Sequence, residues 1–255
     1  MARPVFVIGP GFAAPRARVT FSAMPADRLH KYVVEFDDPQ ALESSLVGSK
    51  AASVADLLRS GAAVPPGFVI HAGAFAGFIK PVAEEIARLL GPVDTDNTAS
   101  ANDASASIIE LLASLTPPEG LAAEVARRID SASSTFAVRS SATAEDLEGA
   151  SFAGMYDTFL DAIDADSVLV RIGDVWSSYY TGRAISYRQR MGIPHDSGSM
   201  AVLVMELIDA DAGGVVFTCD PRDGKDQILV NAAPGLGEGV VSGTTSADSF
   251  IIDPV

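Results

Sequence analysis

Segment 136–146 combines an arginine with small hydroxyl side chains. An apolar stretch that predicts a buried strand ends at Arg139, and serine and threonine residues follow directly. One guanidinium, with hydroxyls and free main-chain amides around it, can hold a phosphate without a high local positive charge. The alternative is structural. Arg139 would then pair with Glu145 or Asp146, and the hydroxyls would bond within their own loop.

Lys50 is one of four lysines in the chain, and it follows a glycine turn at Gly48. The apolar spacing after it predicts a helix that begins at this lysine. A cation at a helix N-terminus opposes the helix dipole, so its position suggests that an anion compensates it. A solvated, exposed lysine is the simpler alternative.

Three glycine-containing segments are candidate phosphate loops. Gly154 stands just before a predicted strand, where a turn can bring the backbone close to a ligand or simply connect two elements. The glycine-dense segment 233–243 can likewise cradle phosphates or only connect strands. Segment 9–14 superficially matches a dinucleotide fingerprint, but Pro10 removes an amide and later prolines interrupt the helix that should follow, which argues against a Rossmann oxidoreductase.

The composition excludes several function classes. The 255 residues carry a formal charge of −15, which argues against binding to nucleic acid or to an anionic membrane. A single cysteine excludes a disulfide framework and a cysteine-based zinc site, and no apolar run is long enough to span a membrane. The charge is uneven, because the proline-rich residues 1–31 are basic. We expect these residues to be an extension rather than a signal peptide, since Pro10 and its neighbouring glycines interrupt the apolar run.

The remaining residues predict a mixed α/β (α+β) body over 32–255, helical over 32–134 and mainly strands over 135–255. Helices are expected at 50–60, with Gly61 as the stop, at 73–90 with a break near Pro81, at 107–115, at 118–131 and, as one long helix, at 166–190. Residues 92–107 are small and polar and predict a loop. Strands are expected at 68–70, 135–139, 157–162, 200–208, 214–218, 227–231 and 249–252. Short connections between the last strands favour a largely antiparallel sheet.

Four phrases together resemble one family. They are VGSKAASVADLLRSGAAVPPGFVI (47–70), FAVRSSATAEDLEGASFAGMYDTFL (136–160), GGVVFTCDP (213–221) and GLGEGVVSGTTSADSFIID (235–253). The chain from residue 32 to 255 resembles the N-terminal ATP-binding domain of the phosphoenolpyruvate synthase and pyruvate phosphate dikinase family, which includes the rifampicin phosphotransferases. The resemblance implies an ATP-grasp-like domain of two lobes that close on ATP, incomplete at its C-terminal end.

The resemblance also implies roles for individual residues. Lys50 and Arg139 would contact the ATP phosphates and act as electrostatic stabilisers. The loop from Gly154 through Met155 to Thr158 would cover the triphosphate. At the two ends of the nucleotide, Met205, Glu206 and Leu207 would form the adenine hinge through main-chain groups, and Glu238 would lie near the phosphates.

Two departures from the family pattern concern hydrogen bonds. The family usually has glutamine where this chain has Met155 and Met205, so two side-chain hydrogen bonds are expected to be absent. Hydrogen bonds to charged groups are worth about 1.5–3 kcal/mol, so their absence bears on ATP binding. The sequence leaves open whether Met155 and Met205 abolish ATP binding.

The chain also stops at Val255, before the family segment that supplies the magnesium ligands. None of His30, His71 and His195 stands in a phosphoacceptor motif, so we expect surface or packing roles for them, and a small buried role for Cys219.

These observations predict the ATP-binding part of a cytoplasmic phosphotransferase of the dikinase type, inactive as an isolated chain. A histidine on another domain or partner chain would pass the phosphoryl group to pyruvate or a hydroxyl compound, with Mg²⁺ held outside this chain. The alternative is a non-catalytic nucleotide-binding or interaction module derived from the same family. Four points stay open. They are the phosphoryl acceptor, the oligomeric state, whether the chain is a fragment or a natural split subunit, and the role of residues 1–31.

Overall fold

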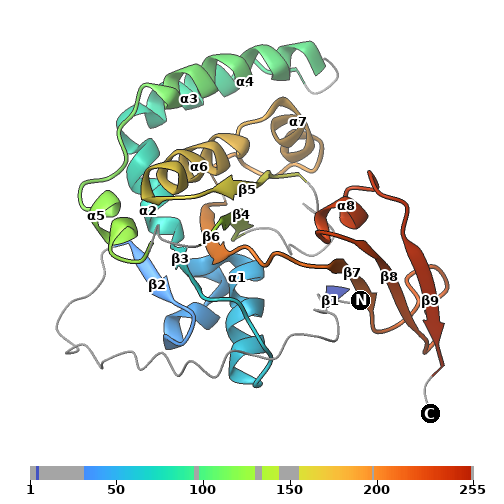
Figure 1. Cartoon of the computed structure of the whole chain (residues 1–255). Helices are drawn as coiled ribbons and strands as arrows, with labels where there is room; N and C mark the ends of the chain where they lie inside the picture. Colours follow the sequence, from blue (N-terminus) through green and yellow to red (C-terminus); the bar gives the residue numbers. More distant parts are fainter. Residues whose placement is uncertain are drawn as a thin grey trace. The chain divides into compact units, whose positions relative to one another are not determined.

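The computed structural model describes residues 4–5, 32–94, 98–129, 134–143, 155–196 and 198–253. They belong to two compact units (Figure 1): a large unit, Ala23–Leu207, and a small unit, Met1–Ser22 with Ile208–Val255. Both units combine helices with antiparallel sheets, so the predicted mixed α/β class is confirmed. No helix in the described ranges is long and apolar enough to cross a membrane.

A five-stranded antiparallel sheet forms the centre of the large unit. Its central strand β6 (Met200–Glu206) is apolar over six consecutive residues and is buried on both faces. Buried strands of this kind read as continuous apolar runs rather than as an alternation. In sheet order the strands are β2 (Val33–Glu35), β3 (Gly67–Ile70), β6, β4 (Phe136–Ala142) and β5 (Thr158–Ala162).

The two faces of this sheet are covered differently. On the α1 face, helix α1 (Ser44–Arg59) packs Val47, Ala51 and Ala55 against strand residues that include Val69 and Leu203. On the opposite face, the core face, alternate strand residues meet the larger aromatic core of the other helices. These helices are α2 (Ala72–Ile79), α3 (Ala83–Leu90), α4 (Thr98–Ala113), α5 (Leu121–Ala126), α6 (Ala165–Ser178) and α7 (Gly182–Arg190). Short 3₁₀ turns lie at Pro39–Leu42 and Lys80–Val82.

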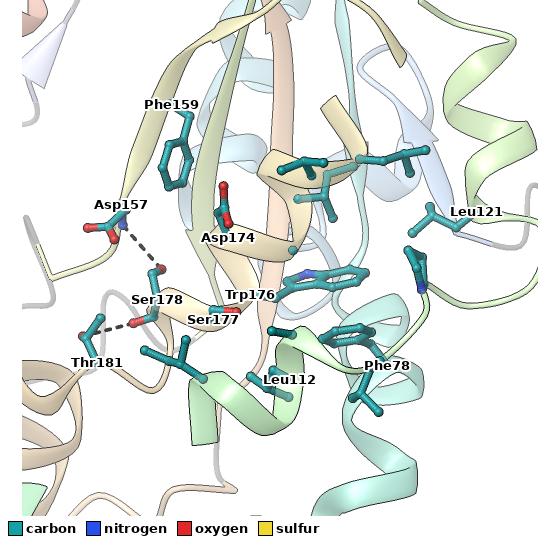
Figure 2. Close-up of a pocket in the computed structure, with 18 residues that line it drawn as sticks. Phe78, Leu112, Leu121, Asp157, Phe159, Asp174, Trp176, Ser177, Ser178 and Thr181 are labelled. Carbon is teal, nitrogen blue, oxygen red and sulfur yellow. Dashed lines mark hydrogen bonds between the residues drawn. The ribbon is translucent and has the colours of Figure 1, made fainter. Parts of the chain in front are cut away.

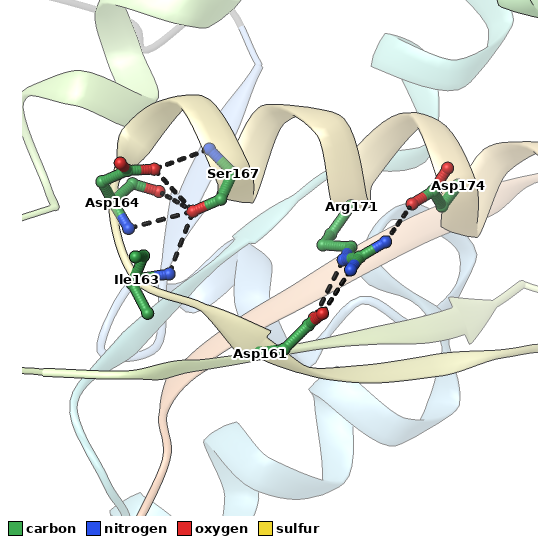
Figure 3. Close-up of polar contacts among 6 residues, drawn as sticks. All are labelled: Asp161, Ile163, Asp164, Ser167, Arg171 and Asp174. Atoms are coloured by element: carbon green, nitrogen blue, oxygen red, sulfur yellow. Dashed lines mark hydrogen bonds and ion pairs between the residues drawn. The ribbon is translucent and has the colours of Figure 1, made fainter.

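Helix α6 shows how local sequence sets the position of an element (Figure 3). It begins with a capping box in which Asp164 Oδ1 accepts from the Ser167 amide at 2.8 Å and Ser167 Oγ accepts from the Asp164 amide at 3.0 Å. Arg171, one turn further on, bonds Asp161 of β5 and Asp174 of the same helix. The cap and the arginine together fix α6 against the edge strand of the sheet.

The small unit is built on a four-stranded antiparallel sheet. Its order is β1 (Pro4–Val5), β7 (Ala212–Phe217), β8 (Ile228–Pro234) and β9 (Asp248–Ile252), with the short helix α8 (Glu238–Val241) after β8. An added Cβ at Gly213 would lie 2.3 Å from the Gly237 nitrogen, and one at Gly214 would lie 2.1 Å from the Asn231 oxygen. Both positions therefore require glycine. The fingerprint-like segment 9–14 lies outside the described residues.

Two predicted elements are wrong, and two short strands, β1 and β2, were missed. Most of the predicted loop at 92–107 belongs to α4, which starts at Thr98. The predicted helix 166–190 is two helices, α6 and α7, separated at Tyr179–Thr181. Strand β2 carries too few residues to give a pattern. The other predicted helices and strands are present with shifted ends, including the break near Pro81 and the positive φ of 85° at Gly61.

Candidate functional site

A kink inside α1 positions Lys50. Gly48 has φ 75° and ψ 162°, a conformation that is essentially restricted to glycine, and it divides the helix just before Lys50. An added Cβ at Gly48 would lie 2.1 Å from the main-chain oxygen of Ser141. The glycine turn predicted before Lys50 is therefore present, although the helix extends back to Ser44.

Ser141 holds this kink against β4. Its buried hydroxyl donates to the Val47 carbonyl oxygen at 2.8 Å and accepts from the Ala51 amide at 3.1 Å. The Ala51 amide lies in the first turn after the kink, where a helix start leaves amide donors without main-chain partners, so the serine acts as a helix cap supplied by a distant strand. As a result, half-buried Lys50 stands where α1 meets β4.

Two hydroxyls in the segment around Arg139 form hydrogen bonds within the fold. Ser140 and Ser141 are buried, and Thr143 Oγ1 accepts from the Ser199 amide at 3.0 Å and donates to its carbonyl oxygen at 3.3 Å. The hydroxyls of Ser141 and Thr143 are therefore bonded to α1 and to Ser199 rather than within their own loop, and their expected phosphate-binding role stays a prediction. The candidate carboxylate partners of Arg139 at 145 and 146 lie outside the described residues.

Strand register places Arg139 on the α1 face. It lies opposite Leu203 of β6 and opposite Thr158 of β5. Residues that lie opposite each other in an antiparallel pair point to the same face. Because Leu203 packs with α1, the half-buried Arg139 and Thr158 share the face that α1 covers. The sheet thus brings Arg139 and Thr158 together as direct neighbours, on the side from which Lys50 approaches.

The end of β6 holds the predicted adenine hinge. Met205 lies two residues after Leu203 and packs at the border of the α1-face core. The amides of Glu206 and Leu207 donate to the carbonyl oxygens of Pro66 at 2.9 Å and Thr135 at 2.7 Å. These two donors are therefore used within the fold. A main-chain hinge at this position would have to rely on other groups, such as the carbonyl acceptors, and its role stays a prediction.

Met155 is the first described residue of the segment that leads into β5. Its side chain packs against the core of the large unit, while its carbonyl oxygen accepts from Arg183 Nε at 3.1 Å. Arg183 also pairs with Asp157 at 2.8 Å, which ties the start of β5 to α7. Gly154, predicted to cover the triphosphate, lies outside the described residues. Sequence patterns do not reveal Arg183, because its partners are more than 25 positions away.

Glu238 belongs to the small unit. It is the first residue of α8, which follows the glycine segment, and Gly235 in that segment has a positive φ of 85°. The TCDP segment of the same unit contains Asp220, whose pKa is lowered to about 2 by hydrogen bonds from Arg222. Cys219 is half-buried rather than fully buried as predicted.

The two described histidines have structural partners. His71 Nδ1 caps α2 by accepting from the Gly73 amide at 3.0 Å. His195 Nδ1 accepts from Nε of the buried Arg188 at 3.1 Å, and burial together with that guanidinium lowers the pKa of His195 to about 4. The packing roles predicted for both agree with these contacts, whereas His30 is not among the described residues. Within the described ranges, no group of three or more histidine, cysteine or acidic residues could hold a metal ion.

Comparisons with known proteins agree with the phrases that carry the resemblance. Residues 44–255 match the family described as pyruvate phosphate dikinase, AMP/ATP-binding domain. The chain is similar to a probable phosphoenolpyruvate synthase of Methanothermobacter thermautotrophicus, 36% identical over 91% of this chain and 35% of that protein. For a probable phosphoenolpyruvate synthase of Methanocaldococcus jannaschii the identity is 36%, over 88% of this chain and 20% of that protein. For a phosphoenolpyruvate synthase of Pyrococcus furiosus it is 30%, over 88% of this chain and 33% of that protein. The chain therefore spans about a third or less of the length of these relatives.

Proposed function

Because the chain belongs to the AMP/ATP-binding domain family of pyruvate phosphate dikinase, we propose that it is the ATP-binding part of an ATP-dependent phosphotransferase of the dikinase type. Its fold is an ATP-grasp-like nucleotide-binding fold. A histidine on another domain or chain would receive the phosphoryl group and pass it to an acceptor such as pyruvate or a hydroxyl compound. We also propose a cytoplasmic location, because ATP is the phosphoryl donor.

The observation that carries the proposal is the shared face of Lys50, Arg139 and Thr158. The kink at Gly48 brings Lys50 to β4, and the strand register puts Arg139 beside Thr158 on the face covered by α1. Two cations and one hydroxyl at the border of a helix and a sheet suit a polyphosphate. Phosphoryl transfer depends on positioning and on charge stabilisation more than on covalent chemistry by the protein.

In this proposal each residue has a separate task. Arg139 binds phosphate oxygens with its planar fork, and Lys50 adds a point charge that neutralises the triphosphate. Thr158 would orient an oxygen beside Arg139, and main-chain groups near Met205 would hold the base. Mg²⁺ would shield the phosphates when it is bound with ATP. Its protein ligands are expected outside this chain.

An exposed sheet edge in the small unit supports the proposal that the enzyme contains a further segment or a partner chain. Strand β9 forms an edge of its sheet and pairs, among described residues, only with β8. Three consecutive apolar residues of β9, Phe250, Ile251 and Ile252, are 50–55% exposed. An exposed apolar edge strand favours pairing with another segment or chain. A further segment or partner that covers this edge therefore belongs to the proposed enzyme.

A phosphotransfer assay on the natural protein, together with whatever co-purifies, tests the proposal. With ATP labelled at the β and γ phosphates, we expect acid-labile label on protein histidine, and the Arg139→Ala variant should lose it. The Arg88→Ala variant removes an equal charge from an exposed i,i+3 ion pair on α3 and should keep the label. Undiminished labelling in Arg139→Ala would contradict the assignment. Absence of labelling in every variant would favour the non-catalytic module.

A further inference from the structure

Thr158 lies beside Arg139 because of the register of an edge strand. Strand β5 is the last strand in its sheet and pairs, among the described residues, only with β4. Successive residues of a strand point to opposite faces, so a slip of one residue would move every side chain of β5 to the other face. Thr158 would then leave the α1 face, on which Arg139 lies. The register of β5 therefore decides whether the proposed ATP site contains this hydroxyl.

An irregularity in the pairing of β5 with β4 weakens the control of this register from one end. Val138 lies opposite Phe159. Phe136, two residues earlier in β4, lies opposite Ala162, three residues later in β5. One extra residue in a strand is typical of a β-bulge. Because the extra residue can absorb a shift, the register at Thr158 depends on contacts at the start of β5.

Arg183 of α7 holds the start of β5 with two bonds. Its Nε donates to the Met155 carbonyl oxygen at 3.1 Å, and its Nη2 pairs with Asp157 Oδ1 at 2.8 Å. Ser178 of α6 adds a third contact, because its Oγ accepts from the Asp157 amide at 3.4 Å (Figure 2). A planar guanidinium that bonds two acceptors two positions apart fixes the segment along its length as well as against the helix.

The ion pair with Arg183 also sets the direction of Thr158. Asp157 and Phe159 line the same cavity as Ser178 of α6 (Figure 2), and Phe159 packs with the core of this face. Thr158 stands between them in the chain, so its side chain points to the opposite, α1 face. This direction agrees with its position opposite Arg139. Arg183 therefore acts on Thr158 through Asp157.

The exposure of the ion pair separates a positioning role from a role in stability. The side chains of Arg183 and Asp157 are 53% and 43% exposed. Ion pairs with this exposure contribute little to the free energy of unfolding. The main effect of the pair is therefore on the register that β5 adopts, and the urea midpoint of Arg183→Ala should be close to that of the unmodified chain.

We propose that Arg183 is a positioning residue for the ATP site: it fixes the register of β5, so that the Thr158 hydroxyl lies beside Arg139. This inference rests on the proposed function for its ligand, because Thr158 is predicted to orient an oxygen of the triphosphate. The register itself can be measured without a nucleotide.

A double-mutant cycle, followed by titration with Mg·ATP, tests the proposal. Thr158→Val removes the hydroxyl and keeps the shape, and Arg183→Ala removes the positioning. Each should weaken ATP binding about fivefold, which is the value of one hydrogen bond. The double variant should also bind about fivefold more weakly, rather than the about 25-fold expected of independent residues. Arg190→Ala, at the exposed end of the same helix, is the matched control and should bind as the unmodified chain does.

Amide hydrogen exchange in the absence of ATP reports on the register. The Ser140 amide donates to the Asp157 carbonyl oxygen at 3.4 Å, whereas the Leu207 amide bonds the chain near the other end of β4. Arg183→Ala should speed exchange at Ser140 about tenfold or more and leave Leu207 unchanged, because only the start of β5 is released. Arg190→Ala should change neither amide.

The two measurements distinguish the possible failures. Equal affinities of Arg183→Ala and Arg190→Ala, or a loss of about 25-fold in the double variant, would overturn the proposal while ATP binding by the unmodified chain stands. Unchanged exchange at Ser140 in Arg183→Ala would also overturn it. If the unmodified chain does not bind ATP, the proposed function fails and the ligand role of Arg183 falls with it. Faster exchange at Ser140 would then still support its effect on the register.

Discussion

At the scale of single residues, one serine and one glycine determine where Lys50 stands. The Ser141 hydroxyl bonds both sides of the kink, and Gly48 allows the backbone to approach it. Chemistry and packing are therefore combined in the VRSS phrase, since Arg139 has a proposed ligand role while the Ser141 hydroxyl is bonded within the fold. A residue type alone does not separate these two tasks.

The first prediction concerns this kink. Gly48→Ala should destabilise the large unit by about 3 kcal/mol or more, because it adds both a forbidden backbone conformation and a steric clash with the Ser141 oxygen. Gly61→Ala is the matched control, since φ is also positive there but nothing lies within 4 Å, and it should cost about 1 kcal/mol. Urea unfolding measures both. Equal losses would mean that the contact with Ser141 does not matter.

The second prediction concerns His195 and pH. Burial and Arg188 lower its pKa from 6.5 to about 4, so the unfolded chain takes up this proton at higher pH than the folded chain. The contribution of neutral His195 to stability should be fully present above pH 6.5 and be lost as the pH falls toward 4. Urea midpoints at pH 7.5 and 5 should therefore fall less in His195→Gln than in the unmodified chain. An identical fall in both proteins would show that another group is responsible.

At the scale of elements, sequence patterns predicted the type of most helices and strands because each carries a clear period or a clear stop. The helix ending at Gly61 and the break near Pro81 are of this kind. Helix α4 was missed in its first half because alanine, serine and asparagine there resemble a loop. Those small residues allow close helix packing, and Asn102 of α4 touches Gly182 at the start of α7 so closely that an added Cβ would lie 2.0 Å away.

The same contact explains the wrong single helix over 166–190. The apolar stripe continues through Tyr179 and Tyr180, so the helical period alone does not show a break. The chain turns at Thr181, whose hydroxyl donates to the Ser178 carbonyl oxygen at 3.1 Å, and α7 then packs on α4. This turn depends on a neighbour that lies about 80 positions away.

The third prediction belongs to α6 and its cap (Figure 3). Asp164→Ala should lower the urea midpoint, because the Ser167 amide then loses its acceptor at the helix start. Asp164→Asn keeps an acceptor and should be close to the unmodified chain. Asp166→Ala removes a charge from the same first turn without removing the cap, and should have a smaller effect. If Asp166→Ala proved as harmful as Asp164→Ala, the helix dipole rather than the cap would dominate.

At the scale of the whole molecule, the sequence established the family, whereas the site stays a prediction. Lys50, Arg139 and Thr158 were predicted from motifs, and the sheet register explains why they belong together. The bonds of the Ser141 and Thr143 hydroxyls were missed because their partners, Val47 and Ser199, lie far away along the chain. The contact of Arg183 with the start of β5 was missed for the same reason. The roles of all the site residues, Gly154 and Glu238 included, stay predictions.

The net charge of −15 fits this account of the whole molecule. An acidic chain can hold a polyphosphate only where a few cations are placed, and the proposal assigns that task to Lys50 and Arg139. Each of them should therefore contribute strongly to ATP binding. Other surface cations of the same charge, apart from Arg183, should contribute little, because their interaction with the ligand is screened over distances beyond about 10 Å.

Isothermal titration of the 255-residue chain with Mg·ATP tests the central claim most directly. The account predicts saturable binding that Arg139→Ala weakens at least about tenfold, because a charge-assisted hydrogen bond to phosphate is lost. Arg88→Ala, which has the same change in net charge on the exposed surface of α3, should leave the affinity unchanged. Equal affinities of Arg139→Ala and Arg88→Ala, or no ATP binding by the unmodified chain, would contradict it.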